Sequence, residues 1–227
     1  SMAPYGDVTL IIADTGNNVL QRLDPSTGNL TRFAGSGTRG FDGDGGPSTE
    51  ASLKGPRGVV IDENGNVYIA DSANHRIRRI DSITGVITTI AGKGERGSTG
   101  DGGPALEATM VSPRSVAIDR NNNLYILDWG NNRVRRLNLE TGIITAYTGT
   151  DKPGFQGDGG PATLAQLWSP MGITLDNHGN LYIADQLNHR IRRVAATTGV
   201  IETVAGTGTI GEFGGYYLGD GTPATEA

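Results

Sequence analysis

Cysteine is absent from this chain of 227 residues, which excludes disulfides, thiol nucleophiles and thiolate metal sites. Histidine is scarce, with three residues, and no apolar stretch approaches the roughly 18 residues that a membrane-spanning helix needs. A basic surplus is also missing, because 24 acidic residues outnumber 19 Lys and Arg and give a net charge of −5. The composition therefore predicts neither a membrane nor a nucleic-acid partner.

Glycine, in contrast, is abundant, and it marks the turns of an internal repeat. The chain holds 36 Gly and 10 Pro. Four aspartates, each 57 residues from the next, lie in segments that align without gaps; they are Asp14, Asp71, Asp128 and Asp185. A repeat that fills the chain almost four times predicts one repetitive body rather than two unrelated domains.

One copy of the repeat has the pattern of four short strands. "GVVID", "NVYIAD", "RIRRID" and "VITTIAG" are rich in β-branched residues and are separated by turn residues. The turns at 63–66 and 81–85 contain the Asn and Gly that tight hairpins need. The sequence therefore predicts an all-β fold of four-stranded antiparallel sheets.

The segments "NGNVYIADSANHRIRRID" and "HGNLYIADQLNHRIRRVA" resemble NHL repeats, the blade unit of a β-propeller family. A Gly-Asp-Gly-Gly-Pro element between the blades resembles the long-linker variety of that family; it recurs at 43–47, 100–104 and 157–161, with a variant at 219–223. The resemblance implies a β-propeller, or an open arc of one, of about four blades. The expected blades are 8–34, 57–91, 114–148 and 171–205, followed by a C-terminal linker at 206–227.

The first blade is expected to lack its innermost strand, because no counterpart of "RGVVID" precedes "VTLIIAD". Three arrangements then stay open: a piece of a longer ring, since the family commonly has six blades; an arc that a second chain completes; and an incomplete ring that closes on itself. We expect an open arc or a piece of a ring rather than closure by the chain alone. Phe213, Tyr216 and Tyr217 in the last linker are predicted to cover an exposed blade edge.

Strand polarity separates the loops into two faces. With the strands of each blade named a to d from the inside outwards, the b–c loops and the long d–a linkers, such as 92–113, emerge at one end of the sheets. We call this end the linker face, and the opposite end, with the a–b and c–d hairpins, the hairpin face. Function tends to lie on loops that a rigid scaffold carries, so we expect a partner to bind the linker face.

Positions where the repeat is broken are the best binding candidates, because a scaffold residue repeats and a contact residue need not. Trp129 replaces Ser72 and Gln186 in a b–c loop, and Trp168 takes the place of Lys54 just before an inner strand. Aromatic residues are common at binding hot spots. An equally open interpretation is that each Trp caps the core between blades.

A basic position also changes along the repeat. Met171 takes the place of Arg57 and Arg114, so the linker face grades from basic on the second blade to apolar and aromatic on the fourth. The predicted ligand-binding residues are therefore Trp129, Trp168, Met171, Lys54, Arg57 and Arg114.

Recurring charged residues are predicted to be structural. The Arg pairs at 78–79, 135–136 and 192–193 alternate along a strand and are expected to form salt bridges rather than a phosphate-binding track. The blade aspartates are expected to accept hydrogen bonds from loop amides or to pair with an Arg, and Asp44 and its counterparts to cap turns rather than bind calcium.

No catalytic or metal site is indicated. His75 and His189 occupy equivalent b–c loops two blades apart, and His178 lies in a hairpin on the opposite face, so the three do not converge. Related propeller enzymes, such as amidating lyases and lactonases, hold a metal with side chains around the central channel. The innermost strands of this chain offer only hairpin aspartates there.

These features predict a non-catalytic scaffold without a cofactor, which binds a protein, a peptide or a glycan through its linker face. Two alternatives stay open. One is a propeller enzyme with a metal at the central channel, and the other is a structural module that self-associates to complete the ring.

Overall fold

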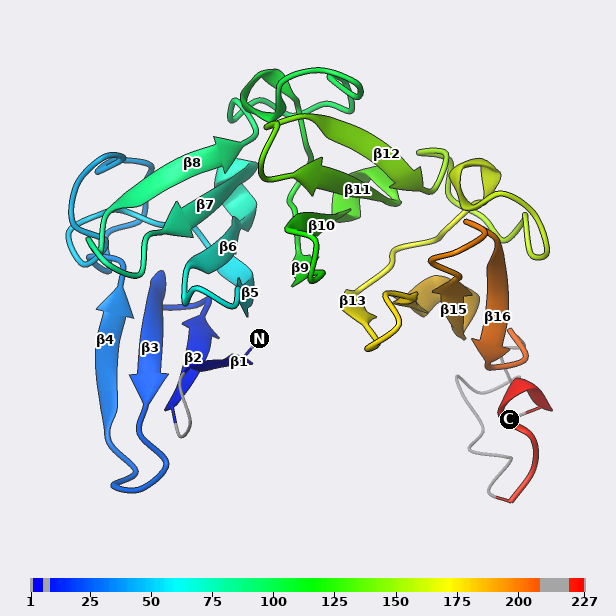
Figure 1. The fold of residues 1–227 in the computed structure, drawn as a ribbon, viewed down its shortest axis with the longest axis horizontal. Helices are drawn as coiled ribbons and strands as arrows, with labels where there is room; N and C mark the ends of the chain where they lie inside the picture. The colour runs from blue at the N-terminus through cyan, green and yellow to red at the C-terminus, as the bar shows by residue number, and fades with distance from the viewer. Residues whose placement is uncertain (1, 6–8, 209–220, 227) are drawn as a thin grey trace.

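The computed structural model describes residues 2–5, 9–208 and 221–226. These residues form four sheets, each of four antiparallel strands, with the orders β1-β2-β3-β4, β5-β6-β7-β8, β9-β10-β11-β12 and β13-β14-β15-β16. The sheets lie beside one another as the blades of an arc (Figure 1). The predicted all-β propeller architecture, with four four-stranded antiparallel blades, is therefore confirmed.

Each blade runs from an inner to an outer strand. The strands are β1 (Met2–Tyr5), β2 (Thr9–Asp14), β3 (Val19–Leu23), β4 (Leu30–Ala34), β5 (Pro56–Ile61), β6 (Val67–Asp71), β7 (Arg76–Ile80), β8 (Ile87–Ala91), β9 (Ser115–Ile118), β10 (Asn123–Asp128), β11 (Arg133–Asn138), β12 (Ile144–Thr148), β13 (Gly172–Leu175), β14 (Leu181–Asp185), β15 (Arg190–Val194) and β16 (Ile201–Ala205). Short 3₁₀ helices occupy the loops and linkers: η1 (Ser72–Asn74), η2 (Ala105–Glu107), η3 (Trp129–Asn131), η4 (Ala162–Leu164), η5 (Gln186–Asn188) and η6 (Ala224–Glu226). No helix in the described part of the chain is long and apolar enough to cross a membrane.

The first blade has an inner strand, which corrects the prediction that it lacks one. Strand β1 pairs antiparallel with β2, with Met2 opposite Ile12 and Tyr5 opposite Thr9. This segment does not resemble the other inner strands, but backbone pairing does not require a particular sequence. An inner strand is also a sheet edge, where a proline such as Pro4 is tolerated.

The arc is open between its first and last blades. In Figure 1 the inner strands β1, β5, β9 and β13 face the concave side, and the outer strands β4, β8, β12 and β16 lie on the convex side. The predicted cover of an exposed edge by Phe213, Tyr216 and Tyr217 concerns residues outside the described part of the chain.

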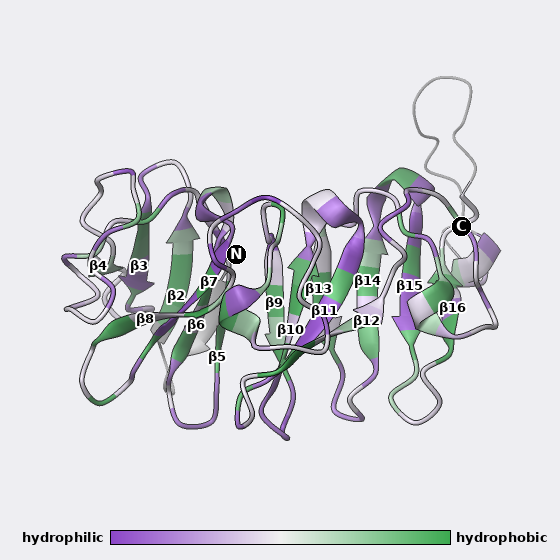
Figure 2. Cartoon of the chain, turned by 90° about the horizontal axis from the view of Figure 1, so that it is seen from above, coloured by the Kyte–Doolittle hydropathy of each residue, from purple (hydrophilic) through white to green (hydrophobic). Residues whose placement is uncertain are grey.

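The hydrophobic core lies between the blades. Each of its three clusters joins two neighbouring blades, and the first, for example, packs Ile11 and Leu20 against Val59 and Ile69. Figure 2 shows apolar residues along the strands and hydrophilic residues in the loops at both ends. A blade therefore needs a neighbour to bury its apolar face.

The linkers hold each blade to the next one. The Gly-Asp-Gly-Gly-Pro element runs along the outer strand of the following blade, where Gly45 N–H donates to the Ile87 carbonyl at 2.8 Å and Ile87 N–H donates to the Gly46 carbonyl at 3.0 Å. The same pair of bonds recurs at the next two blades, with Ile144 and Ile201. The repeated glycines therefore act as connectors between blades.

Candidate functional site

Three buried arginines on the third strands form a structural network under the linker face. Arg78, Arg135 and Arg192 are fully buried. The Arg78 guanidinium lies 2.8 Å from the Asp44 carboxylate of the preceding linker and 3.6 Å from that of Asp71 on the neighbouring strand. Equivalent contacts recur in the third and fourth blades. The salt-bridge prediction for these residues is confirmed.

The blade aspartates complete this network. Asp71, Asp128 and Asp185 are fully buried, and this burial raises the pKa of each above the ordinary value of an aspartate. Each carboxylate accepts a hydrogen bond from a linker N–H and another from an Asn side chain of the b–c loop. The donors include the N–H groups of Lys54 and Trp168. These aspartates therefore fix the linkers.

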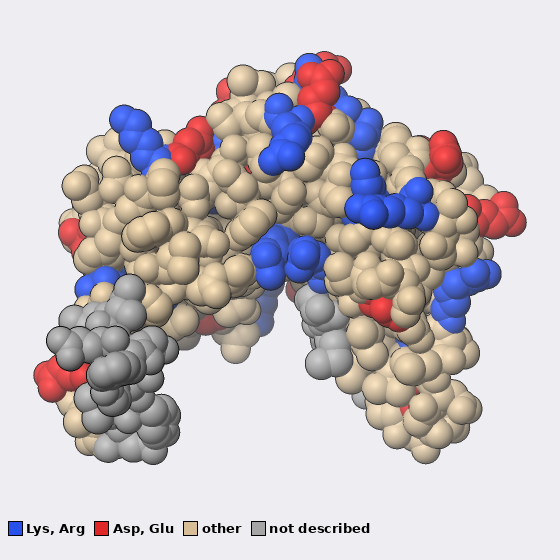
Figure 3. Space-filling view, turned by 180° about the vertical axis from the view of Figure 1, so that it is seen from behind, with Lys and Arg blue, Asp and Glu red and all other residues tan. Residues whose placement is uncertain are grey.

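Arginines without such partners gather in a separate cavity on the linker face, at the inner edge of the arc. The cavity measures about 260 Å³, and we call it the arginine pocket; it is lined by Arg39, Gly55, Arg57, Ser72, Ala73, Ser112, Arg114 and Trp129. Figure 3, which views the molecule from behind, shows basic side chains at this inner edge. Three predicted ligand-binding residues, Arg57, Arg114 and Trp129, therefore lie together.

A close approach of two inner strands brings these arginines together. A Cβ on Gly58 would lie 2.8 Å from the Cα of Ser115 and 2.9 Å from the carbonyl oxygen of Arg114. Only glycine leaves room for β5 and β9 at this distance. The residues just before the contact, Arg57 and Arg114, consequently line one cavity.

The pocket is electrostatically unbalanced. Among the described residues, the guanidinium groups of Arg39, Arg57 and Arg114 make no ion pair and no hydrogen bond. Burial, and to a smaller extent the charge of Arg57, lowers the pKa of Arg114. The pocket therefore carries an unpaired positive charge on a protein whose net charge is −5.

Trp129 is held in place at the rim of this pocket. Its indole N–H donates to Ser169 Oγ at 3.2 Å, and the Arg114 guanidinium lies 5.5 Å from the centre of its ring. On the other side, Ser112 N–H donates to Nδ1 of His75 at 3.0 Å. The rim is thus fixed before any ligand arrives.

The remaining predicted residues lie elsewhere on the linker face. Lys54, Trp168 and Met171 do not line the arginine pocket. Trp168 is 46% exposed, and its carbonyl accepts a hydrogen bond from Leu187 N–H. Sequence reasoning missed Arg39, which comes from the linker between the first two blades; its only signal was a basic residue in a glycine-rich segment.

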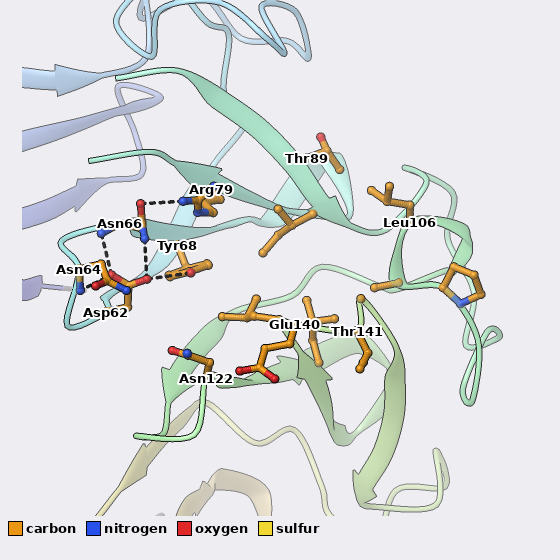
Figure 4. A pocket seen from close by; sticks show the side chains of 16 residues that line it. Asp62, Asn64, Asn66, Tyr68, Arg79, Thr89, Leu106, Asn122, Glu140 and Thr141 are labelled. Atoms are coloured by element: carbon orange, nitrogen blue, oxygen red, sulfur yellow. Dashed lines mark hydrogen bonds between the residues drawn. The ribbon is translucent and has the colours of Figure 1, made fainter. Parts of the chain in front are cut away.

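The hairpin face carries larger grooves that the sequence did not predict. One groove of about 550 Å³ lies between the second and third blades (Figure 4). Asp62, Asn66 and Tyr68 lie on one wall, and Glu140 and Thr141 on the other. The wall is stabilised by hydrogen bonds to the Asp62 carboxylate, from Asn66 Nδ2 at 2.7 Å and from the Tyr68 hydroxyl at 3.0 Å.

An equivalent groove of about 570 Å³ lies between the third and fourth blades. Tyr125 and Tyr147 meet there edge to face, with ring centres 4.8 Å apart. Burial raises the pKa of both hydroxyls, as it raises that of Tyr68 to about 12. The recurring Asp, Asn and Tyr indicate a scaffold feature of the hairpins rather than a break in the repeat.

The described residues contain no group of three or more His, Cys, Asp or Glu placed to hold a metal ion. His75 and His189 each end a 3₁₀ turn in the left-handed conformation, at φ 55° and 51°.

The family model described as "Teneurin NHL domain" matches residues 18–99 and 151–212, and the model described as "NHL repeat" matches residues 111–137. The chain belongs to the NHL-repeat family. Among curated relatives, this NHL-repeat chain is 32% identical to the protein SUPPRESSOR OF QUENCHING 1, chloroplastic, of Arabidopsis thaliana, over 89% of the chain and 20% of that protein. It is 25% identical to NHL repeat-containing protein 2 of Bos taurus, over 94% and 33%, and 31% identical to teneurin-3 of Danio rerio, over 87% and 8%. The chain thus spans a third or less of these relatives.

Solved structures share the fold of this NHL-repeat chain. A structural genomics protein of unknown function from Bacteroides thetaiotaomicron has a TM-score of 0.67 at 20% identity, over 85% of this chain and 46% of that one. A nidogen/laminin complex has a TM-score of 0.61 at 16% identity, over 89% and 61%. A gluconolactonase from Xanthomonas campestris has a TM-score of 0.61 at 12% identity, over 89% and 60%. Binding proteins and enzymes therefore share this architecture.

Proposed function

We propose that this NHL-repeat chain is a non-catalytic scaffold that presents its linker face to a protein, a peptide or a glycan. The observation that carries the proposal is the arginine pocket. Its Trp129 breaks the repeat, and its Arg57 and Arg114 are replaced by Met171 on the fourth blade. Residues that only stabilise the blades repeat from blade to blade, as the buried Arg and Asp residues do.

Two comparisons support a protein partner. Teneurins and NHL repeat-containing proteins carry related segments, and one solved neighbour is part of a nidogen/laminin complex. The aromatic ring of Trp129 beside cationic groups is typical of binding hot spots.

Selection from a random peptide library on the immobilised full chain tests the proposal. The affinity of an enriched peptide is then measured for the natural chain, for Trp129→Ala and for the matched control Arg120→Gln, which changes an exposed arginine on the hairpin face. We expect Trp129→Ala to weaken binding at least about tenfold and the control to leave it unchanged. Unchanged affinity with Trp129→Ala, or a loss only with Arg120→Gln, would contradict the proposal.

Two measurements separate the alternatives. A propeller enzyme with a metal at its channel predicts stoichiometric metal in elemental analysis of the purified protein. A self-associating module predicts a solution mass above the 23.7 kDa of one chain in light scattering at micromolar concentration. The scaffold requires neither result.

A further inference from the structure

The chemistry of the arginine pocket identifies the kind of group that it accepts. This inference deepens the proposed function and rests on it. We propose that the pocket binds a carboxylate, and that it selects an acidic peptide segment whose Asp or Glu side chain lies between Arg57 and Arg114.

The first step is the contrast between the two sets of arginines. Every deeply buried guanidinium on the third strands has a carboxylate within 3.0 Å, as in the pairs Arg78–Asp44 and Arg192–Asp158. Arg76 and Arg190, which are less buried, stack on Phe41 and Phe155 with 3.7 and 3.8 Å to the ring centres. These arginines of the third strands are therefore neutralised by carboxylates or stacked on aromatic rings.

The pocket arginines lack such a counter-charge. Arg57 is exposed and Arg114 is half-buried, and the Arg114 guanidinium lies over the ring of Trp129. The charges of Arg57 and Arg114, which line one cavity, repel one another, and an anion between them would relieve that repulsion. Guanidinium groups bind carboxylates with charge-assisted and often bidentate hydrogen bonds.

The surroundings favour a peptide carboxylate over a nucleic-acid backbone. The basic residues form one cavity of about 260 Å³ instead of a track, and the chain as a whole is acidic. Trp129 beside the pocket offers an apolar surface to the residue that follows the acidic one. Its indole N–H is already bonded to Ser169, so only its ring is available for this contact.

The fourth blade supplies the matched variants. Met171 occupies the position of Arg57 and Arg114, so Arg57→Met and Arg114→Met introduce a residue that this repeat already accommodates. We expect each variant to keep the melting temperature of the natural chain or to raise it, because a like-charge contact is removed. A binding loss with unchanged stability cannot come from misfolding.

The experiment uses peptides enriched on the full chain and tests the inference separately from the proposed function. We expect these peptides to be rich in Asp or Glu, and their Glu→Gln versions to bind about tenfold more weakly or worse. Arg57→Met and Arg114→Met are expected to lower affinity by a similar factor, and Arg120→Gln to leave it unchanged. Added salt should weaken the interaction.

Three results would overturn the inference. The enriched peptides could lack acidic residues and still bind Trp129→Ala more weakly. This result would agree with the scaffold proposal but would contradict carboxylate binding by the pocket. Unchanged peptide affinity in both Arg→Met variants would also contradict carboxylate binding by the pocket. A single-stranded oligodeoxynucleotide whose binding depends on Arg57 and Arg114 would identify a phosphate site instead.

Discussion

The residues at one position of the third strand show how much a neighbouring blade contributes. Ile77 is fully buried between the second and third blades, whereas Ile191, at the equivalent position of the fourth blade, is 38% exposed. The residues that pair with Ile191 are of the same types as those that pair with Ile77. The difference in exposure therefore arises because no further blade in the described part of the chain packs against the fourth blade. Burial at this position is therefore a property of the contact between blades.

This contrast predicts different responses to the same substitution. Ile77→Ala should lower the free energy of unfolding by about 2–5 kcal/mol, because it removes buried methyl groups and leaves a cavity. Ile191→Ala should lower it by less than about 1 kcal/mol. Urea denaturation of both variants measures the difference, and equal losses would show that the fourth blade is covered in solution.

The buried hydroxyl of Tyr68 predicts that the stability of the fold decreases at alkaline pH. Burial raises its pKa to about 12 from an ordinary 10.0, so the folded state favours the neutral phenol. The stability that this provides is fully present below pH 10 and is lost as the pH rises towards 12. In a spectrophotometric titration, Tyr68→Phe should remove one late-titrating tyrosine, and an unchanged late phase would contradict the burial.

At the scale of the elements, the blade pattern could be predicted from sequence because its causes are local. β-Branched runs and Asn-Gly turns specify strands and hairpins within one copy of the repeat. Strand β1 could not be predicted, because Met2–Tyr5 has no repeat counterpart and its pairing with β2 is decided by the tertiary arrangement. The grooves of the hairpin face were missed because they form between blades, from residues that repeat.

The ion pair that connects a linker to the next blade is predicted to contribute measurably to the free energy of unfolding. Asp101, in the linker before the third blade, lies 2.8 Å from the fully buried Arg135. Asp101→Ala should destabilise the fold by about 3 kcal/mol or more, because it leaves a buried cation without its nearest carboxylate. Glu95→Ala, which breaks the exposed pair with Lys93, is the matched control and should lower the free energy of unfolding by less than about 1 kcal/mol. Equal effects would show that the linker does not hold the blade.

At the scale of the whole molecule, the candidate site depends on parts that are distant in sequence. The repeat itself indicated Arg57, Arg114 and Trp129 as departures from the pattern, and the structure brings these three together. Arg39 joins them from the linker between the first two blades. Because it is distant in sequence from the other pocket residues, no local sequence pattern indicates that they lie together. Lys54, Trp168 and Met171 do not line the pocket, and Trp168 and Met171 belong to the segment before β13 of the fourth blade.

We propose that a partner binds the linker face and not the hairpin face. Hydrogen exchange of the full chain, with and without a peptide selected on it, tests this most directly. We expect slower exchange at 54–57, 112–114 and 129–132, around the arginine pocket, and no change at 62–66 and 119–123 in the hairpins. Slower exchange confined to the hairpin segments would contradict it.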